Sequence, residues 1–522
     1  MAMHRAENWG ALNQSRPNGW RLRLVDARFL LAGLFPAGVL LSAEAWGEYL
    51  GDAVLLSLIT SLCFMLFLAG VREISDRTLM PILIALVFII AYPLKIYVFA
   101  VTAWDPTGLG ALSFVLTWAP ILPSNTLYEV YEIGMLGLMA FFVTASFLIR
   151  LGRNPRQATA WRTTLDRRTA TRLLWIALGI SVVVLTGLNL LALKLGILRM
   201  GIEPRPLPFR LGGVIFFSRA FVGSFVLSLI LFFGLRLRAK RIVGATIIAF
   251  VYAGLFTAIV SASRGSLLMS FLLPVWLAIV TGEMRMRHIV RTRNVFVGLI
   301  LMTVLGLMHP LITSYRTAAT EEKLSDTEAL QAAVTFVGDR MMEDPLGVAT
   351  AGVGSILARI VGAENLIIAR ETVGVPDREA IWRYVVHRGH LMAVYYTREV
   401  LGYNTYDFQI TPGLVAFFWF LGGSQAVVGG MVLFTLFAFI MIGMCRARVI
   451  QVSGPVQVAI IAPWLAILVS EGTLQQALSI EQLLMLLGSI AATETLGRLF
   501  VFWSRFPHRL TESRNASAPI IS

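Results

Sequence analysis

The sequence predicts an all-α polytopic membrane protein, and three observations carry this prediction. Of the 522 residues, 57% are hydrophobic and only 14% are charged. Several apolar runs reach about 20 residues, which is the length that a helix needs to cross the hydrocarbon core of a bilayer. One long polar segment, residues 314–411, interrupts these runs late in the chain. The chain is therefore expected to form a bundle of about twelve membrane helices that carries one large helical loop.

Windows of this length predict twelve membrane spans, an even number that places both chain ends on the same side of the membrane. The first apolar run follows a long arginine-bearing leader, residues 1–28, so it is interpreted as a retained anchor and not a cleaved signal peptide. Residues 504–522 form the expected tail. The predicted spans cover residues 29–46, 53–71, 80–102, 127–149, 173–195, 213–235, 242–260, 266–281, 295–313, 412–444, 455–470 and 483–503.

The distribution of basic residues predicts the orientation, because short cytoplasmic loops collect Lys and Arg. With both termini inside, the inner segments hold 27 of the 44 basic residues. The short outer loops at 47–52, 103–126 and 471–482 hold none. The net charge of +14 is thus explained by membrane topology, and it does not indicate nucleic-acid binding. The termini are predicted to be cytoplasmic and the polar loop to lie outside.

A few arginines depart from this rule and are candidate anion ligands. Arg210 lies between the fifth and sixth spans, Arg264 lies in the tight turn between the seventh and eighth, and Arg316 begins the polar loop. We expect them to meet at one membrane surface. A turn needs small residues and a polar cap but no cation, although a helix cap or a lipid headgroup contact remains an alternative for Arg264. Arg219 falls inside the sixth span, where a cation is costly and usually faces a cavity or a carboxylate.

Two other charged features are interpreted as structural. Glu494 and Arg498 lie four residues apart in the last span, so they share one helical face and can neutralise each other. Lys95 follows Tyr92 and Pro93 in the third span, where the proline breaks the helix. Its side chain is expected to extend to the outer headgroups.

The polar loop has its own character. Its 98 residues include nine basic and thirteen acidic side chains, a net charge of −4. Residues 325–328, Ser-Asp-Thr-Glu, match a capping box, which predicts a helix from there to about Met342. A second helical stretch is expected from Val353 to Thr372. Both helices are predicted to lie on the outer membrane surface as a lid.

Residues 377–390 hold the densest group of phosphate binders and proton carriers, including Arg388, His387 and His390. The two histidines are three residues apart, so a helix would place them on one face. Imidazole titrates near neutral pH and can accept a proton from a sugar hydroxyl. A metal pair and ordinary surface histidines are the alternatives, and no third ligand stands at a recognised spacing.

An apolar run of about 33 residues follows the loop, beginning at Pro412-Gly413 and containing Gly422-Gly423 and Gly429-Gly430. It is too long for one simple span. We expect a short broken or re-entrant helix that forms a groove for a lipid chain, followed by the true span. Close helix packing through small residues is the alternative reason for the glycines.

The twelve spans, the Ser263-Arg264-Gly265 turn, the large late loop and the re-entry from Pro412-Gly413 to Gly422-Gly423 resemble the O-antigen and exopolysaccharide repeat-unit polymerases. These are often called Wzy-type, and the O-antigen ligases are more distant relatives. The resemblance implies a GT-C-like bundle in a bacterial inner membrane. It implies an inverting glycosyltransferase that joins undecaprenyl diphosphate-linked oligosaccharides on the periplasmic side, with no metal or other cofactor. A chain-length regulator and a flippase would be its protein partners.

Such a transfer assigns roles to the candidate residues. The leaving diphosphate needs neutralisation by preorganised cations, and the acceptor hydroxyl needs a base. His390 is preferred to His387 as this base, while Glu129 and Glu132 near the outer end of the fourth span are alternatives. The expected diphosphate ligands are Arg264 and Arg316 first, then Arg210, Arg388 and Arg219.

Three other functions stay open at this point. A twelve-span secondary transporter would carry a Gly, Asp-Arg and Gly-Arg signature after its second span, but residues 70–78 keep only Asp76-Arg77. Two equal halves are also missing, because the polar loop lies late in the chain. A transferase that uses a lipid monophosphate-linked sugar, and a non-catalytic membrane scaffold, are the remaining alternatives.

Overall fold

The computed structural model of this chain is helical in nearly all the residues that it describes, and none of these is in a β-strand. Eight of its helices are long and apolar enough to cross a membrane, so the chain is a multi-pass α-helical membrane protein. The residues described are 19–71 and 78–102, 123–151, 167–196, 208, 211–261, 264–281, 310–312, 314–315, 318, 324–344, 347–348, 362–363, 365–367, 370, 379, 413–445, 452–471 and 480–516.

Eight of the twelve predicted spans correspond to these long helices. Three others are also helical but shorter: the apolar helices there are Arg28–Leu41, Arg264–Val280 and Gly454–Val469. The predicted span 295–313 falls largely outside the described residues. The number twelve therefore stays a prediction, whereas the multi-span helical architecture is confirmed.

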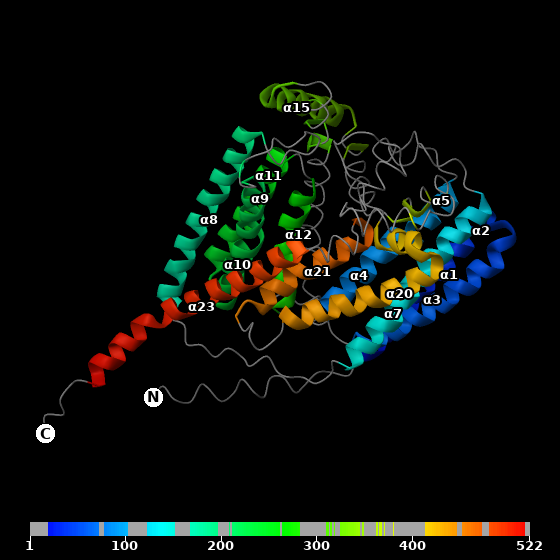
Figure 1. Cartoon of the computed structure of the whole chain (residues 1–522), viewed down its shortest axis with the longest axis horizontal. Helices are drawn as coiled ribbons and strands as arrows, with labels where there is room; N and C mark the ends of the chain where they lie inside the picture. Colours follow the sequence, from blue (N-terminus) through cyan, green and yellow to red (C-terminus); the bar gives the residue numbers. More distant parts are fainter. Residues whose placement is uncertain are drawn as a thin grey trace.

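The helices form two bundles, seen side by side in Figure 1. Aromatic side chains such as Phe67, Phe141 and Phe142 fill the core of the first bundle, and Phe225, Phe232 and Phe233 belong to that of the second. The first bundle contains α1 (Gly19–Leu41), α2 (Ala43–Trp46), α3 (Leu50–Gly70), α4 (Leu79–Ile89), α5 (Lys95–Thr102), α7 (Ser124–Leu151) and α20 (Gly413–Cys445). The second contains α8 (Arg167–Leu195), α9 (Leu211–Ala220), α10 (Leu227–Arg236), α11 (Lys240–Ser261), α12 (Arg264–Val280) and α23 (Ile480–Ala516).

Helix α21 (Gly454–Glu471) joins the two bundles. Its Val456 and Ile460 belong to the second core, whereas Val458 and Ile461 belong to the first. An apolar helix that is buried on all sides has no polar face to expose. This explains why α21 lies between the bundles and not at the edge of the molecule.

Two membrane helices contain a π-helical turn. Turn η3 (Ile90–Leu94) includes Pro93, which lacks the N–H needed for a regular helix, so the helix is distorted there and continues through Val98, whereas the sequence predicted a break. Turn η5 (Phe221–Val226) separates α9 from α10. Turns of this kind are frequent at functional sites, and η5 begins two residues after Arg219.

Helix α20 is broken, as the sequence predicts. Gly422 and Gly423 have non-helical backbone angles, and Gly423 has a φ of 67°, a conformation that favours glycine. A straight helix would separate Phe418 from Gly430 by about 18 Å. Instead, a Cβ added to Gly430 would lie 2.3 Å from the Phe418 ring. The short arm before the break therefore folds back on the long one.

The polar loop contributes α15 (Asp326–Glu343), which lies at the top of Figure 1, opposite the end of the molecule where α23 terminates. We call the α15 side the insert end. Ser325 caps α15 with both hydrogen bonds of the predicted capping box. The small core beneath it contains Tyr315, Ala318, Ala329 and Ala333.

A second part of the loop, residues 362–370, is here named the docked segment. Its described apolar residues Ala363, Leu366 and Ile367 are buried in the core of the first bundle. Gly362 approaches the Ala91 carbonyl so closely that an added Cβ would lie 2.6 Å from the oxygen. The sequence predicted this stretch on the membrane surface. The described apolar residues of the docked segment are buried in the bundle core, and its place relative to the membrane surface stays a prediction.

Candidate functional site

The second bundle holds a buried cation inside the membrane. Arg219 on α9 is 6% exposed and lies about 12 Å from the first residue of that helix. Its Nη1 donates a hydrogen bond of 3.3 Å to Asn189 Oδ1 on α8. Asn189 is fully buried and contacts Thr257 Oγ1 on α11 through its own amide at 3.4 Å. Three helices thus meet at one polar cluster, the Arg219 cluster.

Neutral groups alone surround this guanidinium in the described part of the chain. Arg219 forms no ion pair there, and Asn189 supplies its hydrogen-bond acceptor. Guanidinium has five N–H donors, and the described residues accept a hydrogen bond from only one of its nitrogens. An isolated charge is expensive inside a membrane protein unless it is paired or binds a ligand. The arrangement therefore favours an anionic ligand.

Apolar layers close the Arg219 cluster at both ends along the bundle axis. Ala192, Ile215 and Val260 are buried together about one turn nearer the insert end. On the opposite side lie Leu185 and Phe225 of the main core. The cluster is consequently a polar layer between two apolar ones.

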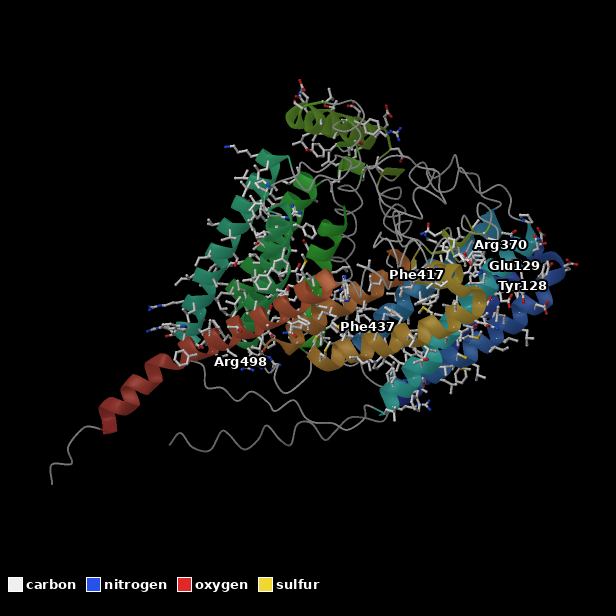
Figure 2. The ribbon with its side chains drawn as sticks, viewed as in Figure 1. Tyr128, Glu129, Arg370, Phe417, Phe437 and Arg498 are labelled. Carbon is white, nitrogen blue, oxygen red and sulfur yellow. The ribbon has the colours of Figure 1, made fainter. Side chains whose placement is uncertain are left out.

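A second polar contact anchors the docked segment at the insert end of the first bundle (Figure 2). Arg370 Nε lies 2.5 Å from Glu129 Oε2, and its Nη1 donates a hydrogen bond of 2.6 Å to Thr126 Oγ1. Both partners are in the first two turns of α7. The side chains of Arg370 and Glu129 are 24% and 46% exposed, so the ion pair is only partly screened by solvent.

This ion pair changes the interpretation of the α7 carboxylates. The Glu129 carboxylate is engaged by the Arg370 guanidinium, so one of its oxygens already serves as an ion-pair acceptor. Glu129 is therefore better suited to anchoring the loop than to acting as a base. Glu132, one turn further along, has no ion-pair partner among the described residues. Nearby, the rings of Tyr49 and Tyr128 stack with centroids 5.1 Å apart.

The structure places few of the predicted site residues. Arg219 is buried as expected. Arg264 is the first residue of α12, and the structure describes the backbone of Arg264 but not its side chain. The remaining candidates lie outside the described residues: Arg210, Arg316, His387, Arg388 and His390.

Sequence reasoning missed Asn189, Thr257 and Arg370. A signal for Asn189 was present, because it is a polar residue in the stripe that α8 buries at helical spacing. That stripe is Leu174, Leu178, Ser181, Leu185, Asn189 and Ala192. Arg370 carried no such signal, since its partner Glu129 lies 241 positions away in the sequence.

The predicted pair of Glu494 and Arg498 on α23 is confirmed, with Oε1 and Nε 2.8 Å apart. The carboxylate does more than the spacing suggested. It also accepts hydrogen bonds from the backbone N–H groups of Val452 and Ser453 and from the Ser453 hydroxyl. These groups immediately precede α21, so Glu494 satisfies donors at the start of the helix between the bundles.

No group of three or more His, Cys, Asp or Glu side chains could hold a metal ion in the described part of the chain. The donor set of the Arg219 cluster suits an anion instead. No protein-family model, curated protein or solved structure matches this chain.

Proposed function

We propose that this chain is a glycan polymerase of a bacterial inner membrane, with its site facing the periplasm and both termini in the cytoplasm. It would join undecaprenyl diphosphate-linked oligosaccharide repeat units into an O-antigen or exopolysaccharide. One observation carries the proposal: Arg219 is a buried cation among membrane helices with a neutral amide as its hydrogen-bond partner.

A lipid-linked diphosphate sugar suits this observation in two ways. Its phosphates are anions that are delivered within the membrane, and guanidinium binds phosphate oxygens through paired hydrogen bonds. The loop also fits the proposal. The docked segment is buried in the first bundle and fixed by Arg370 to Glu129, so the loop is held against the insert end. A loop anchored in this way can cover a reaction at the membrane surface.

The proposed reaction is a direct displacement. The acceptor hydroxyl attacks the anomeric carbon of the donor, a new C–O bond forms, and the bond to the diphosphate breaks. The electron pair leaves on the diphosphate, which the arginines neutralise without a metal. The hydroxyl proton passes to His390, or to His387. The proposed diphosphate ligands at the reacting surface are Arg264, Arg316, Arg210 and Arg388, and Arg219 is the proposed ligand of a lipid-linked diphosphate deeper in the second bundle.

A twelve-span anion transporter is the second candidate. A cation enclosed between two apolar layers is also a way to hold an anionic solute deep in the membrane. The described helices argue against it, because the two bundles are not repeats of one another. The first bundle includes the folded-back α20, whereas the second is built from consecutive helices and α23. A transferase that uses a monophosphate-linked sugar shares the same anion chemistry.

The test is a polymer ladder on a gel, made from purified protein and lipid diphosphate-linked repeat units. Wild type should give a ladder that Arg264→Ala and Arg219→Gln abolish and His390→Ala reduces at least about 100-fold. Arg236→Gln, a change at the far end of the same span, is the matched control. No ladder with the cognate substrate, together with movement of a solute across vesicles, would support the transporter.

A further inference from the structure

We infer that the Arg219 cluster is a lipid-phosphate site that is filled sideways from the bilayer, past the membrane-facing side of α8. This inference deepens the proposed function and rests on it only for the identity of the lipid. The site would bind the phosphate group of a membrane lipid, with Asn189 as the positioning residue for the guanidinium.

Access along the bundle axis is closed among the described residues. Ala192, Ile215 and Val260 are each at most 3% exposed and form an apolar layer between the Arg219 cluster and the insert end. Leu185 and Phe225, which are 2% and 9% exposed, lie on the opposite side. A hydrated phosphate would lose its water in crossing either layer, which is costly.

The side of the bundle is different. A hydrogen bond of 2.9 Å joins Thr186 Oγ1 on α8 to Tyr252 Oη on α11, and Tyr252 is 39% exposed. The Thr186 hydroxyl also donates to the Val182 carbonyl of its own helix at 2.8 Å, so the two hydroxyls form a hydrogen-bonded polar pair on this otherwise apolar side of the bundle. Thr186 lies one turn from Asn189 along α8, so this pair is a polar step between the bilayer and the Arg219 cluster.

The same side of α8 can carry a hydrocarbon chain. Val183 is 71% exposed and Leu190 is 52% exposed, while a Cβ added to Gly187 would meet no atom within 4 Å. A lipid tail can lie along this apolar surface while its phosphate reaches the buried arginine. A soluble phosphate would gain nothing from the surface and would still have to leave water.

An unpaired buried charge also makes a prediction about the ligand-free protein. If Arg219 serves only the fold, its removal should lower stability, because cavities and lost contacts are costly. If it serves a ligand, the empty site holds a destabilising charge, and its removal should raise stability. Arg219→Met removes the charge with little change in volume. Asn189→Asp places a carboxylate beside the guanidinium and fills the role of the anion.

The experiment measures thermal unfolding of the full-length protein in detergent micelles. The probes are undecaprenyl diphosphate, phosphatidylglycerol, inorganic diphosphate and uncharged undecaprenol. Undecaprenyl diphosphate should raise the unfolding temperature of wild type by about 2 °C or more. Inorganic diphosphate and undecaprenol should produce no shift. Arg219→Met and Asn189→Asp should each abolish the lipid response. Both should also raise the unfolding temperature of the ligand-free protein. Arg236→Met is the control and should leave the lipid response unchanged.

The outcomes separate the sources of the phosphate. A response to undecaprenyl diphosphate alone assigns the glycan carrier, and an equal response to phosphatidylglycerol assigns a phospholipid. An equal response to inorganic diphosphate would overturn access from the bilayer. Two results would overturn the assignment of Arg219 as the phosphate ligand. One is a lipid response that persists in Arg219→Met. The other is an Arg219→Met protein that responds to no lipid and is less stable than wild type without ligand. The polymer ladder fails or succeeds independently, because lipid binding does not require turnover.

Discussion

The two bundles treat their buried polar groups differently. In the first, hydrogen bonds between helices satisfy several of them: Ser61 donates to the Ala32 carbonyl, Ser146 donates to the Leu66 carbonyl, and the Tyr97 and Tyr131 hydroxyls lie 3.0 Å apart. In the second, Asn189 is the one hydrogen-bond partner of Arg219 within the described part of the chain. Among the described residues, Ser228 Oγ on one of its helices has no hydrogen-bond partner, and neither has Trp276 Nε1, which packs against both cores, or Gln457 Oε1 on the adjoining α21.

This difference suggests a division of labour. Each buried polar group left unsatisfied costs about 1–3 kcal/mol, so a bundle that satisfies such groups gains stability and loses the capacity to bind a polar ligand. The first bundle has the character of a scaffold, and it also receives the docked segment of the loop. The second keeps the polar capacity that a substrate could use. Substitutions at satisfied groups should lower stability, whereas the change at Arg219 described above should raise it.

Glu494 gives the largest expected effect, because it satisfies several donors where α21 enters between the bundles. Glu494→Ala leaves two backbone N–H groups and the Ser453 hydroxyl without their acceptor, and should cost about 3 kcal/mol of unfolding free energy. Arg498→Ala should cost less than about 1 kcal/mol, since its side chain is 54% exposed. Denaturant unfolding in micelles measures both. Equal losses would mean that the ion pair, and not the capping of α21, stabilises this junction.

The fold-back of α20 comes next and tests the rigidity of the first bundle. Gly430→Ala places a Cβ against the base of the Phe418 ring, so it should cost about 2 kcal/mol. Gly429→Ala is the matched control, because its Cβ would meet nothing within 4 Å. Thermal unfolding compares the two variants. In a Phe418→Leu background the penalty at Gly430 should shrink, and an unchanged penalty would contradict the contact between the arms.

The anchor of the docked segment should have a smaller effect. Removing the side chain of Arg370 or Glu129 should lower the free energy that holds the docked segment in place by about 1 kcal/mol. The value is limited by the partial exposure of both side chains. The expected readout is faster proteolysis of the loop with little change in global unfolding. In a double-mutant cycle, the Arg370→Ala and Glu129→Ala losses should not add. Full additivity would show that the two side chains do not interact in solution.

Local sequence patterns predicted much of this fold. The capping box at Ser325 and the break at Gly422-Gly423 each follow from chemistry within a few residues, and the structure confirms both. At Pro93 it shows a distortion in place of the predicted break. The pairing of Glu494 with Arg498 has the same origin, because four residues span one helical turn. Hydropathy also predicted a multi-span membrane protein from local sequence, because the length of a span depends on the thickness of the bilayer and not on distant residues.

Contacts between residues far apart in the sequence could not be predicted from local patterns. The docked segment is a short apolar run on a polar loop, and a surface helix of a lid would show the same pattern. The docked segment is buried because it packs against the core of the first bundle, which is formed by residues far away in the sequence. Asn189 shows the same limit at the candidate site. Its place in the α8 stripe indicates burial, but nothing local shows that it faces Arg219.

Helix α15, which lies on the insert side of the second bundle in Figure 1, gives the smallest expected effect. Hydrogen bonds from the Ser325 hydroxyl and backbone lower the pKa of Glu328 from its ordinary 4.5. A lowered pKa adds stability that is fully present above pH 4.5 and is lost as pH falls through the folded pKa. Amide exchange at the start of α15 should therefore be protected at pH 7 and lose protection as the pH falls below 4.5 through the lowered pKa. Glu328→Gln should remove this pH dependence, and Asp339→Asn, on the same helix but away from its first turn, should keep it.

Ser325→Ala should lower protection about five-fold at neutral pH. If exchange in the second bundle also rises when α15 frays, the loop and that bundle open together, and the contrast between the bundles extends to their motions.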